Sequence, residues 1–316
     1  MLRRFIRSII TFCVIIAIVV IGVGAYIGNI AYTEFREAPW DSLLGIENHT
    51  KDVSVIEQWE AERGWEKVWV TAPDGIQLRG TYIENSEPTN NTVILLHGLF
   101  QNRTMCLPYI RIYRNLGYNV LLIDLRGHGE SGGSHTDWGL SEQGDMDAWM
   151  AFLKKRNPHM TVGLHGISLG AAMSLLYAGG SHGSNVSFVV ADSSYGNIIA
   201  LGQEKLREAQ ADKWTIRGYK LLDPFFQGAM YYHTGKLVSN IEPAQAVKHI
   251  TAPVLFLHGS DDALVPVKTA KSLYDNCRSL QKDIYIFGHS GHAVGIATNK
   301  DEYIDVVTDF LGHANS

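Results

Sequence analysis

A serine stands between two glycines near the middle of the chain. Ser168 is the third residue of Gly166-Ile167-Ser168-Leu169-Gly170, which matches the pattern G-x-S-x-G. An apolar, strand-like run precedes this segment, and a helical pattern rich in small residues follows it over Leu169–Ala178. A tight strand-to-helix turn would strain the serine and expose its hydroxyl as a nucleophile. The start of the following helix would direct backbone N–H groups toward negative charge that develops on a substrate.

A nucleophilic serine needs a base and an acid that orients the base. His292 follows the last predicted strand, and His289 is its competitor three residues earlier. Asp261 and Asp262 are adjacent and follow the preceding predicted strand, and only one of them can point at the histidine. The serine, acid and histidine thus occur in that order along the chain. This order is typical of one class of serine hydrolases and differs from the order in others.

Short apolar runs alternate with helical patterns over most of the chain. The apolar runs are Thr92–Leu96, Asn119–Ile123, Met160–Leu164, Phe188–Ala191, Pro253–Leu257 and the more alternating Lys282–Phe287. The helical patterns cover Met105–Leu116, Glu142–Lys155, Leu169–Ala178, Val267–Cys277 and Asp301–Leu311. This alternation predicts an α/β fold, with a mostly parallel central sheet and helices on both faces. Ligands of such sheets bind beyond the carboxyl ends of the strands, where the candidate residues lie.

Two further stretches depart from this alternation. Glu66–Thr71 and Ile76–Ile83 flank an Asp-Gly turn and predict an antiparallel pair at the start of the domain. Residues 196–250 have helical patterns and no clear strand, and they predict a small helical cap; the alternative is ordinary connecting helices. Aromatic residues in or beside the stretch are Tyr195, Trp214, Tyr219, Phe225, Phe226, Tyr231 and Tyr232.

The N-terminal segment predicts a membrane anchor. Residues 1–7 are basic, and residues 8–30 are apolar without a charge, which is long enough to cross a bilayer as a helix. The cationic residues favour a cytoplasmic N-terminus, which places the remaining chain on the extracytoplasmic side. A cleaved signal peptide is the alternative, although its apolar region is usually shorter. Residues 31–63 would form a connector with a helix near Val53–Arg63, and the domain would cover 64–316.

Composition limits the remaining possibilities. The chain has 316 residues, a formal net charge of −5 and no long basic run beyond its N-terminus, so no nucleic-acid partner is expected. Its three cysteines are Cys13, Cys106 and Cys277, and none forms a C-x-x-C pair, so no zinc site is indicated. Whether Cys106 and Cys277 lie close enough to pair depends on the fold.

These motifs together resemble the α/β-hydrolase superfamily over residues 64–312. Within it, the chain is similar to bacterial hydrolases of the serine aminopeptidase and esterase-like group, often with an N-terminal membrane segment. The segments that carry the resemblance are Leu96-His97-Gly98, Asp124–Gly132, His165–Ala172, Ala191–Tyr195 and Pro253–Pro266. The resemblance implies the α/β-hydrolase fold, no metal and no organic cofactor.

The resemblance also selects among the candidate residues. In the family pattern H-G-x-x-D-x-x-V-P the acid position is Asp262, and the terminal G-H-A pattern puts the base at His292. The loop after Leu96 would supply one oxyanion N–H, from Leu99 with Phe100 as the alternative, and Leu169 would supply the other. The Asp124–Gly132 segment would be a structural turn held by Arg126 and His128.

The expected activity is hydrolysis of a small-molecule carboxylic ester through an acyl-enzyme, outside the cytoplasmic membrane. The same triad could serve a peptidase or amidase, or an acyltransferase if an alcohol competes with water. The name aminopeptidase, which describes some relatives, implies an acidic group for a substrate ammonium, and the sequence does not identify one. A membrane-tethered binding protein on a catalytically inactive hydrolase fold is the alternative from another class.

Overall fold

The computed structural model describes residues 2–208 and 213–314. The chain divides into a larger unit, Trp40–Gly202 with Ser239–Ser316, and a smaller unit, Met1–Pro39 with Gln203–Val238. Residue 1 of the predicted basic N-terminus, residues 209–212 of the predicted cap and residues 315–316 of the predicted domain lie outside the described residues. The side chains of Trp214 and Tyr219 lie outside them as well.

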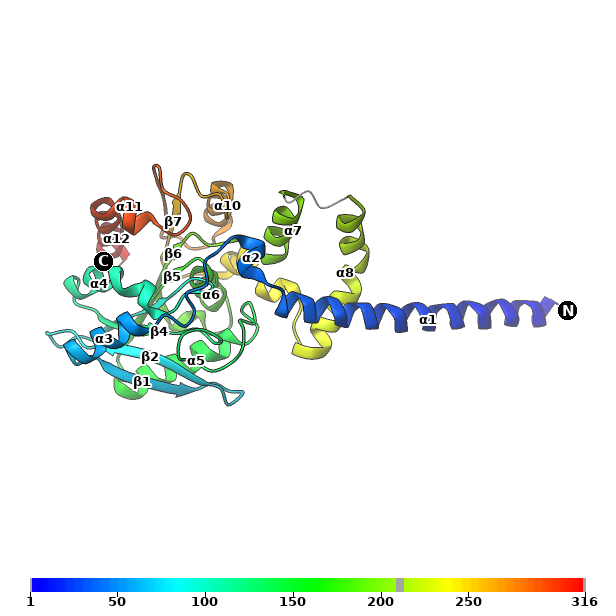
Figure 1. Cartoon of the computed structure of the whole chain (residues 1–316), viewed down its shortest axis with the longest axis horizontal. Helices are drawn as coiled ribbons and strands as arrows, with labels where there is room; N and C mark the ends of the chain where they lie inside the picture. Colours follow the sequence, from blue (N-terminus) through cyan, green and yellow to red (C-terminus); the bar gives the residue numbers. More distant parts are fainter. Residues whose placement is uncertain (1, 209–212, 315–316) are drawn as a thin grey trace. The chain divides into compact units, whose positions relative to one another are not determined.

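An eight-stranded sheet forms the centre of the larger unit (Figure 1). Its strands are β1 (Glu66–Thr71), β2 (Gln77–Ile83), β3 (Asn91–Leu96), β4 (Asn119–Ile123), β5 (Thr161–Ile167), β6 (Val186–Asp192), β7 (Val254–Gly259) and β8 (Lys282–Phe287). The spatial order is β1-β2-β4-β3-β5-β6-β7-β8. β2 is antiparallel to both β1 and β4, and all other pairs are parallel. The predicted mostly parallel sheet and its opening antiparallel pair are therefore confirmed.

Helices cover both faces of this sheet (Figure 1). α3 (Ser54–Arg63), α4 (Ile110–Asn115) and α12 (Lys300–Ala314) share one core cluster with Val93 and Leu95 of β3. The alternate residues of β3 point to the opposite face, where α6 (Leu169–Ala178) packs against β3, β5 and β6. α5 (Glu142–Arg156) packs against α6, and α10 (Val267–Asn276) packs against β7 and β8. The short helices α2 (Trp40–Leu44) and α11 (Gly295–Thr298) also belong to this unit.

One predicted helix differs from the structure. The pattern over Met105–Leu116 begins instead as a 3₁₀ helix, η1 (Arg103–Tyr109), and becomes α-helical only in α4. Pro108 lies inside η1 and has no N–H, so it cannot donate the bond that an α-helix would require at this position.

The described residues of the stretch 196–250 contain helices and no strand. They form α7 (Ile198–Glu208), α8 (Lys213–Thr234), η3 (Val238–Ile241), α9 (Pro243–Ala246) and η4 (Val247–His249). α7 begins in the larger unit and ends in the smaller one. That this stretch forms a cap over the site stays a prediction.

The N-terminal helix of the smaller unit is long and apolar enough to cross a membrane. α1 (Leu2–Glu37) extends beyond the predicted apolar span of 8–30 at both ends. Only 6% of its most apolar window is buried. A helix that exposes this much apolar surface has no favourable environment in water, and a bilayer would provide one.

Candidate active site

Ser168 occupies the turn between β5 and α6. Its backbone has φ 53° and ψ −109°, a strained conformation for a residue with a side chain. The turn depends on close backbone approaches, because a Cβ on Gly166 would lie 2.1 Å from the carbonyl oxygen of Gly170. A Cβ on Gly170 would lie 2.2 Å from the carbonyl oxygen of Leu96. These contacts explain why the glycines of the pattern are required here.

The structure brings His292 and Asp262 to Ser168. Nε2 of His292 lies 2.8 Å from Oγ of Ser168, and Nδ1 of His292 lies 2.7 Å from Oδ2 of Asp262. The competing residues lie elsewhere: the side chain of His289 is fully exposed, and that of Asp261 is 62% exposed. The hydrogen bonds to Ser168 and His292 therefore distinguish His292 from His289 and Asp262 from Asp261.

The carboxylate of Asp262 is held in one orientation by four contacts. Oδ1 accepts hydrogen bonds from the backbone N–H groups of Leu264 (2.9 Å) and Val265 (2.8 Å). Oδ2 faces His292 and also Nε2 of His258, at 3.1 Å. Burial would raise the pKa of this carboxyl, but the hydrogen bonds from His258 and His292 outweigh it, and the pKa lies well below its usual range. Asp262 is therefore ionised and can stabilise a positive charge on His292.

The loop after β3 contains two candidate oxyanion donors whose N–H groups differ in whether they are already hydrogen-bonded. The N–H of Phe100 donates to Nε2 of His128 at 3.1 Å, so it is already used. Within residues 2–208 and 213–314, the N–H groups of Leu99 and Leu169 take part in no hydrogen bond. Of the two candidates for the first oxyanion donor, Leu99 thus has the available N–H.

Two neutral histidines hold this loop. Nε2 of His97 accepts from the N–H of Leu125 (3.0 Å), and its Nδ1–H donates to the carbonyl of Gly98. Nδ1–H of His128 donates to the carbonyl of Arg126 (2.9 Å), which leaves Nε2 as the acceptor for Phe100. Burial lowers the pKa of His128 to about 4 and that of His97 well below its ordinary value. Both rings are therefore uncharged acceptors at neutral pH.

The turn over Asp124–Gly132 is tied to other elements by Arg126. Its guanidinium bonds the carboxylate of Asp145 on α5, with Nε 2.7 Å from Oδ2, and that of Asp74 at 2.9 Å. The sequence suggested that Arg126 and His128 hold this turn. The structure adds that His128 connects the turn to the loop of the oxyanion candidates.

Asp192 and Ser193 form a connection that the sequence reading did not assign. The carbonyl of Asp192 accepts from the N–H of Ser168 (2.7 Å), and its buried carboxylate accepts from Oγ of Ser193 (2.8 Å) and Oη of Tyr303 (2.9 Å). Oγ of Ser193 accepts from the N–H of Ala293 (3.1 Å), next to His292. This pair therefore links the serine turn to the histidine loop. The sequence signal that could have identified this pair is its position at the carboxyl end of β6.

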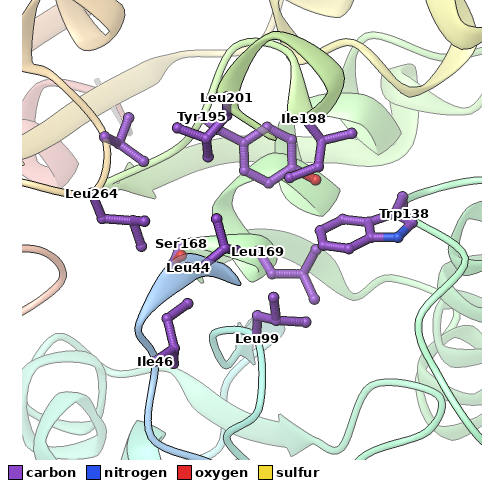
Figure 2. Close-up of a pocket in the computed structure, with 11 residues that line it drawn as sticks. Leu44, Ile46, Leu99, Trp138, Ser168, Leu169, Tyr195, Ile198, Leu201 and Leu264 are labelled. Carbon is purple, nitrogen blue, oxygen red and sulfur yellow. The ribbon is translucent and has the colours of Figure 1, made fainter. Parts of the chain in front are cut away.

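An apolar pocket adjoins Ser168 (Figure 2). The space between its lining atoms, with open solvent included, amounts to about 280 Å³. Its lining residues besides Ser168 are Leu44, Ile46, Leu99, Trp138, Leu169, Tyr195, Ile198, Leu201, Leu264 and Val265. In the part of the chain that is described, the buried hydroxyl of Tyr195 has no hydrogen-bond partner. The pocket thus offers mainly aliphatic and aromatic surface.

Cys106 and Cys277 do not pair. Both are free thiols and both are buried. They lie in the larger unit as small apolar side chains, which answers the question that the sequence left open.

Comparison with known proteins finds a matching family model, similar proteins and a similar solved structure. A family model described as alpha/beta hydrolase fold matches residues 91–236. The uncharacterized protein YqkD of Bacillus subtilis is 31% identical over 242 residues, which are 76% of this chain and 77% of YqkD. Lysophosphatidylserine lipase ABHD12 of Danio rerio is 29% identical over 66% of this chain and 54% of its own length. The structure of the Pyrococcus furiosus esterase Pf2001 superposes with a TM-score of 0.64 at 25% identity, over 80% of this chain and 95% of the esterase.

Proposed function

This chain belongs to the α/β-hydrolase family, and from that premise we propose that it is a serine hydrolase that cleaves carboxylic esters through an acyl-enzyme. The observation that carries the proposal is the hydrogen-bond chain from Ser168 through His292 to Asp262. This hydrogen-bond chain supports the proposal because acyl transfer by a serine requires a hydroxyl hydrogen-bonded to a base, and a base oriented by an ionised acid.

In the proposed reaction, Nε2 of His292 takes the proton of Ser168 as Oγ attacks the ester carbonyl. The N–H groups of Leu99 and Leu169 stabilise the oxyanion. Asp262 keeps the proton of His292 on Nδ1 and stabilises the imidazolium. His292 then gives its proton to the alkoxide that leaves. Water attacks the acyl-enzyme by the same steps and releases the acid.

The substrate that we propose carries an aliphatic acyl group. The pocket beside Ser168 supports this, because nearly all of its lining side chains are apolar and burial of a methylene group contributes about 0.8 kcal/mol. The names of two similar proteins, a lysophosphatidylserine lipase and an esterase, are consistent with ester cleavage.

We further propose that α1 is an uncleaved anchor and that the larger unit faces the extracytoplasmic side. Arg3, Arg4 and Arg7 precede the apolar residues of α1, and such cations favour the cytoplasmic side of the membrane. The ester or acyl substrate would then be extracytoplasmic.

A matched pair of substrates tests the reaction class. The full chain in detergent should hydrolyse p-nitrophenyl acyl esters far faster than p-nitroanilides of the same acyl groups. Comparable rates on the anilides would favour the peptidase or amidase. Transfer of the acyl group to added alcohol in preference to water would favour the acyltransferase. A chain that turns over neither substrate and does not react with a fluorophosphonate would be a binding protein, contrary to the proposal.

A further inference from the structure

The helices of the smaller unit, α1 and α8, approach each other through glycines. A Cβ on Gly24 would lie 1.9 Å from the ring of Phe225, and a Cβ on Gly28 would lie 2.3 Å from its carbonyl oxygen. The glycines are four residues apart and share one face of α1. This small-residue spacing is the one that lets helices pack closely within a membrane. Here it accommodates α8 of the same chain.

Polar and aromatic contacts continue this interface beyond Gly28. Nε2–H of His233 donates to Oδ1 of Asn29 at 2.6 Å, and the ring of His233 stacks on Tyr32 at 4.7 Å. The rings of Phe35 and Phe226 meet edge to face at 5.6 Å. α8 is therefore fixed to the second half of α1 by contacts that begin within the apolar span.

The position of these contacts along α1 gives the depth of α8. Gly28 lies 21 residues after Arg7, the last cation before the apolar span, which corresponds to roughly 32 Å along a helix. The hydrocarbon core of a bilayer is about 30 Å thick. With Arg7 at one boundary, Gly28 lies at the other, and Gly24 lies inside the hydrocarbon. Phe225 therefore lies at the outer boundary.

α8 exposes an uncharged stripe that extends before and after Phe225 along the helix. Leu221 and Tyr232 are eleven residues apart, which is three helical turns, so they share a face with the exposed Gly228 between them. Their exposures are 76% and 85%, and the neighbouring Tyr231 is 60% exposed. Tyrosine is enriched where membrane proteins cross the lipid–water boundary, because its ring is apolar and its hydroxyl is polar.

We propose that α8 is a second membrane-contacting helix, whose stripe of Leu221, Tyr231 and Tyr232 lies in the outer interface of the bilayer that α1 spans. The partner of this surface is lipid. The proposal rests on the anchoring role of α1 proposed above. Along the chain, α7, which begins near the pocket-lining Ile198 and Leu201, precedes α8.

Fluorescence quenching in vesicles tests the depth of each position. The full chain, with Cys13→Ser to remove the exposed thiol, would carry one labelled cysteine at Leu221→Cys or Tyr232→Cys. Ile18→Cys, on the exposed apolar face of α1, is the deep reference, and Lys271→Cys, exposed on α10, is the aqueous reference. Each variant must keep the thermal unfolding midpoint of its parent before it is compared.

Labels at Leu221→Cys and Tyr232→Cys should lose most of their fluorescence to lipids with a nitroxide near the head group and resist aqueous iodide. If iodide quenches both while Ile18→Cys is quenched by lipids with a deep nitroxide, α1 is an anchor and the inference about α8 is wrong. If Ile18→Cys is not quenched by lipid, the anchor fails and the inference fails with it. Labels shielded from both quenchers would mean contact with protein, such as a second copy, and would also overturn the proposal.

Discussion

The substitution Asp262→Asn tests the proposed mechanism, because the contacts of this side chain determine which atom of the asparagine would face His292. The carboxylate is oriented by two backbone N–H groups, those of Leu264 and Val265, which both donate to Oδ1. In the asparagine, these two donors select the carbonyl oxygen for the Oδ1 position. The amide nitrogen must then take the position of Oδ2 and face His292.

An amide nitrogen at that position donates to Nδ1 of His292 and moves the imidazole proton to Nε2. Nε2 then cannot accept the proton of Ser168, although the three side chains remain in place. The loss of the correct tautomer in a related triad lowers kcat by about 10⁴. We expect a loss of roughly 10³ to 10⁴ in kcat for Asp262→Asn, which corresponds to about 4–5.5 kcal/mol.

The assay is steady-state hydrolysis of a p-nitrophenyl acyl ester by the full chain, with the rate of fluorophosphonate labelling as a second readout. Asp261→Asn is the matched control, because its side chain is 62% exposed and bonds the neighbouring Ser260 rather than His292. The control should keep its kcat within a factor of two. The reasoning is refuted if Asp262→Asn keeps a tenth or more of the activity, or if Asp261→Asn loses as much.

Three further predictions concern other parts of the molecule. Because the pKa of His128 is lowered to about 4, the folded state binds fewer protons than the unfolded state between about pH 4 and 6.5, and the free energy of unfolding falls as the pH falls through this range. In urea unfolding, His128→Gln should reduce the slope of that free energy against pH by about 1.4 kcal/mol per pH unit. An unchanged slope would contradict the prediction. Gly28→Leu should detach α8 and lower the thermal unfolding midpoint in detergent, whereas Gly22→Leu, with nothing within 4 Å of its Cβ, should not; equal effects would argue against the glycine contact. Leu201→Trp should fill the pocket and reduce turnover of long-chain esters relative to short-chain ones, whereas the exposed Leu280→Trp should not. An equal effect on all chain lengths would show that the pocket does not hold the acyl group.

The local pattern around Ser168 could be predicted because chemistry and backbone geometry constrain the same few residues. A buried parallel strand reads as a continuous apolar run, and a strand-to-helix turn without space for side chains requires glycine. The alternation of strands and helices then brought the carboxyl ends of β5, β7 and β8 to one edge. The strand runs and the glycine turn are each encoded within short stretches of sequence, and the alternating pattern then implies the parallel sheet that brings their ends together.

Other features depended on contacts between distant residues. Leu99 and Phe100 are equivalent as sequence, and only the bond from Phe100 to His128, 28 residues later, distinguishes their N–H groups. The link from Asp192 through Ser193 to the histidine loop likewise spans about a hundred residues. The pairing of Gly24 and Gly28 with α8 could not be predicted, because a small-residue face indicates close packing without identifying the partner.

The proposed function requires Ser168 to be the nucleophile of an acyl transfer reaction. The most direct measurement is fluorophosphonate labelling of the full chain, followed by peptide mass mapping, with Ser168→Ala beside it. We predict one adduct on Ser168, loss of ester turnover in step with labelling, and neither labelling nor turnover in Ser168→Ala. An adduct on another residue, such as Ser193, or turnover retained by Ser168→Ala would contradict the account.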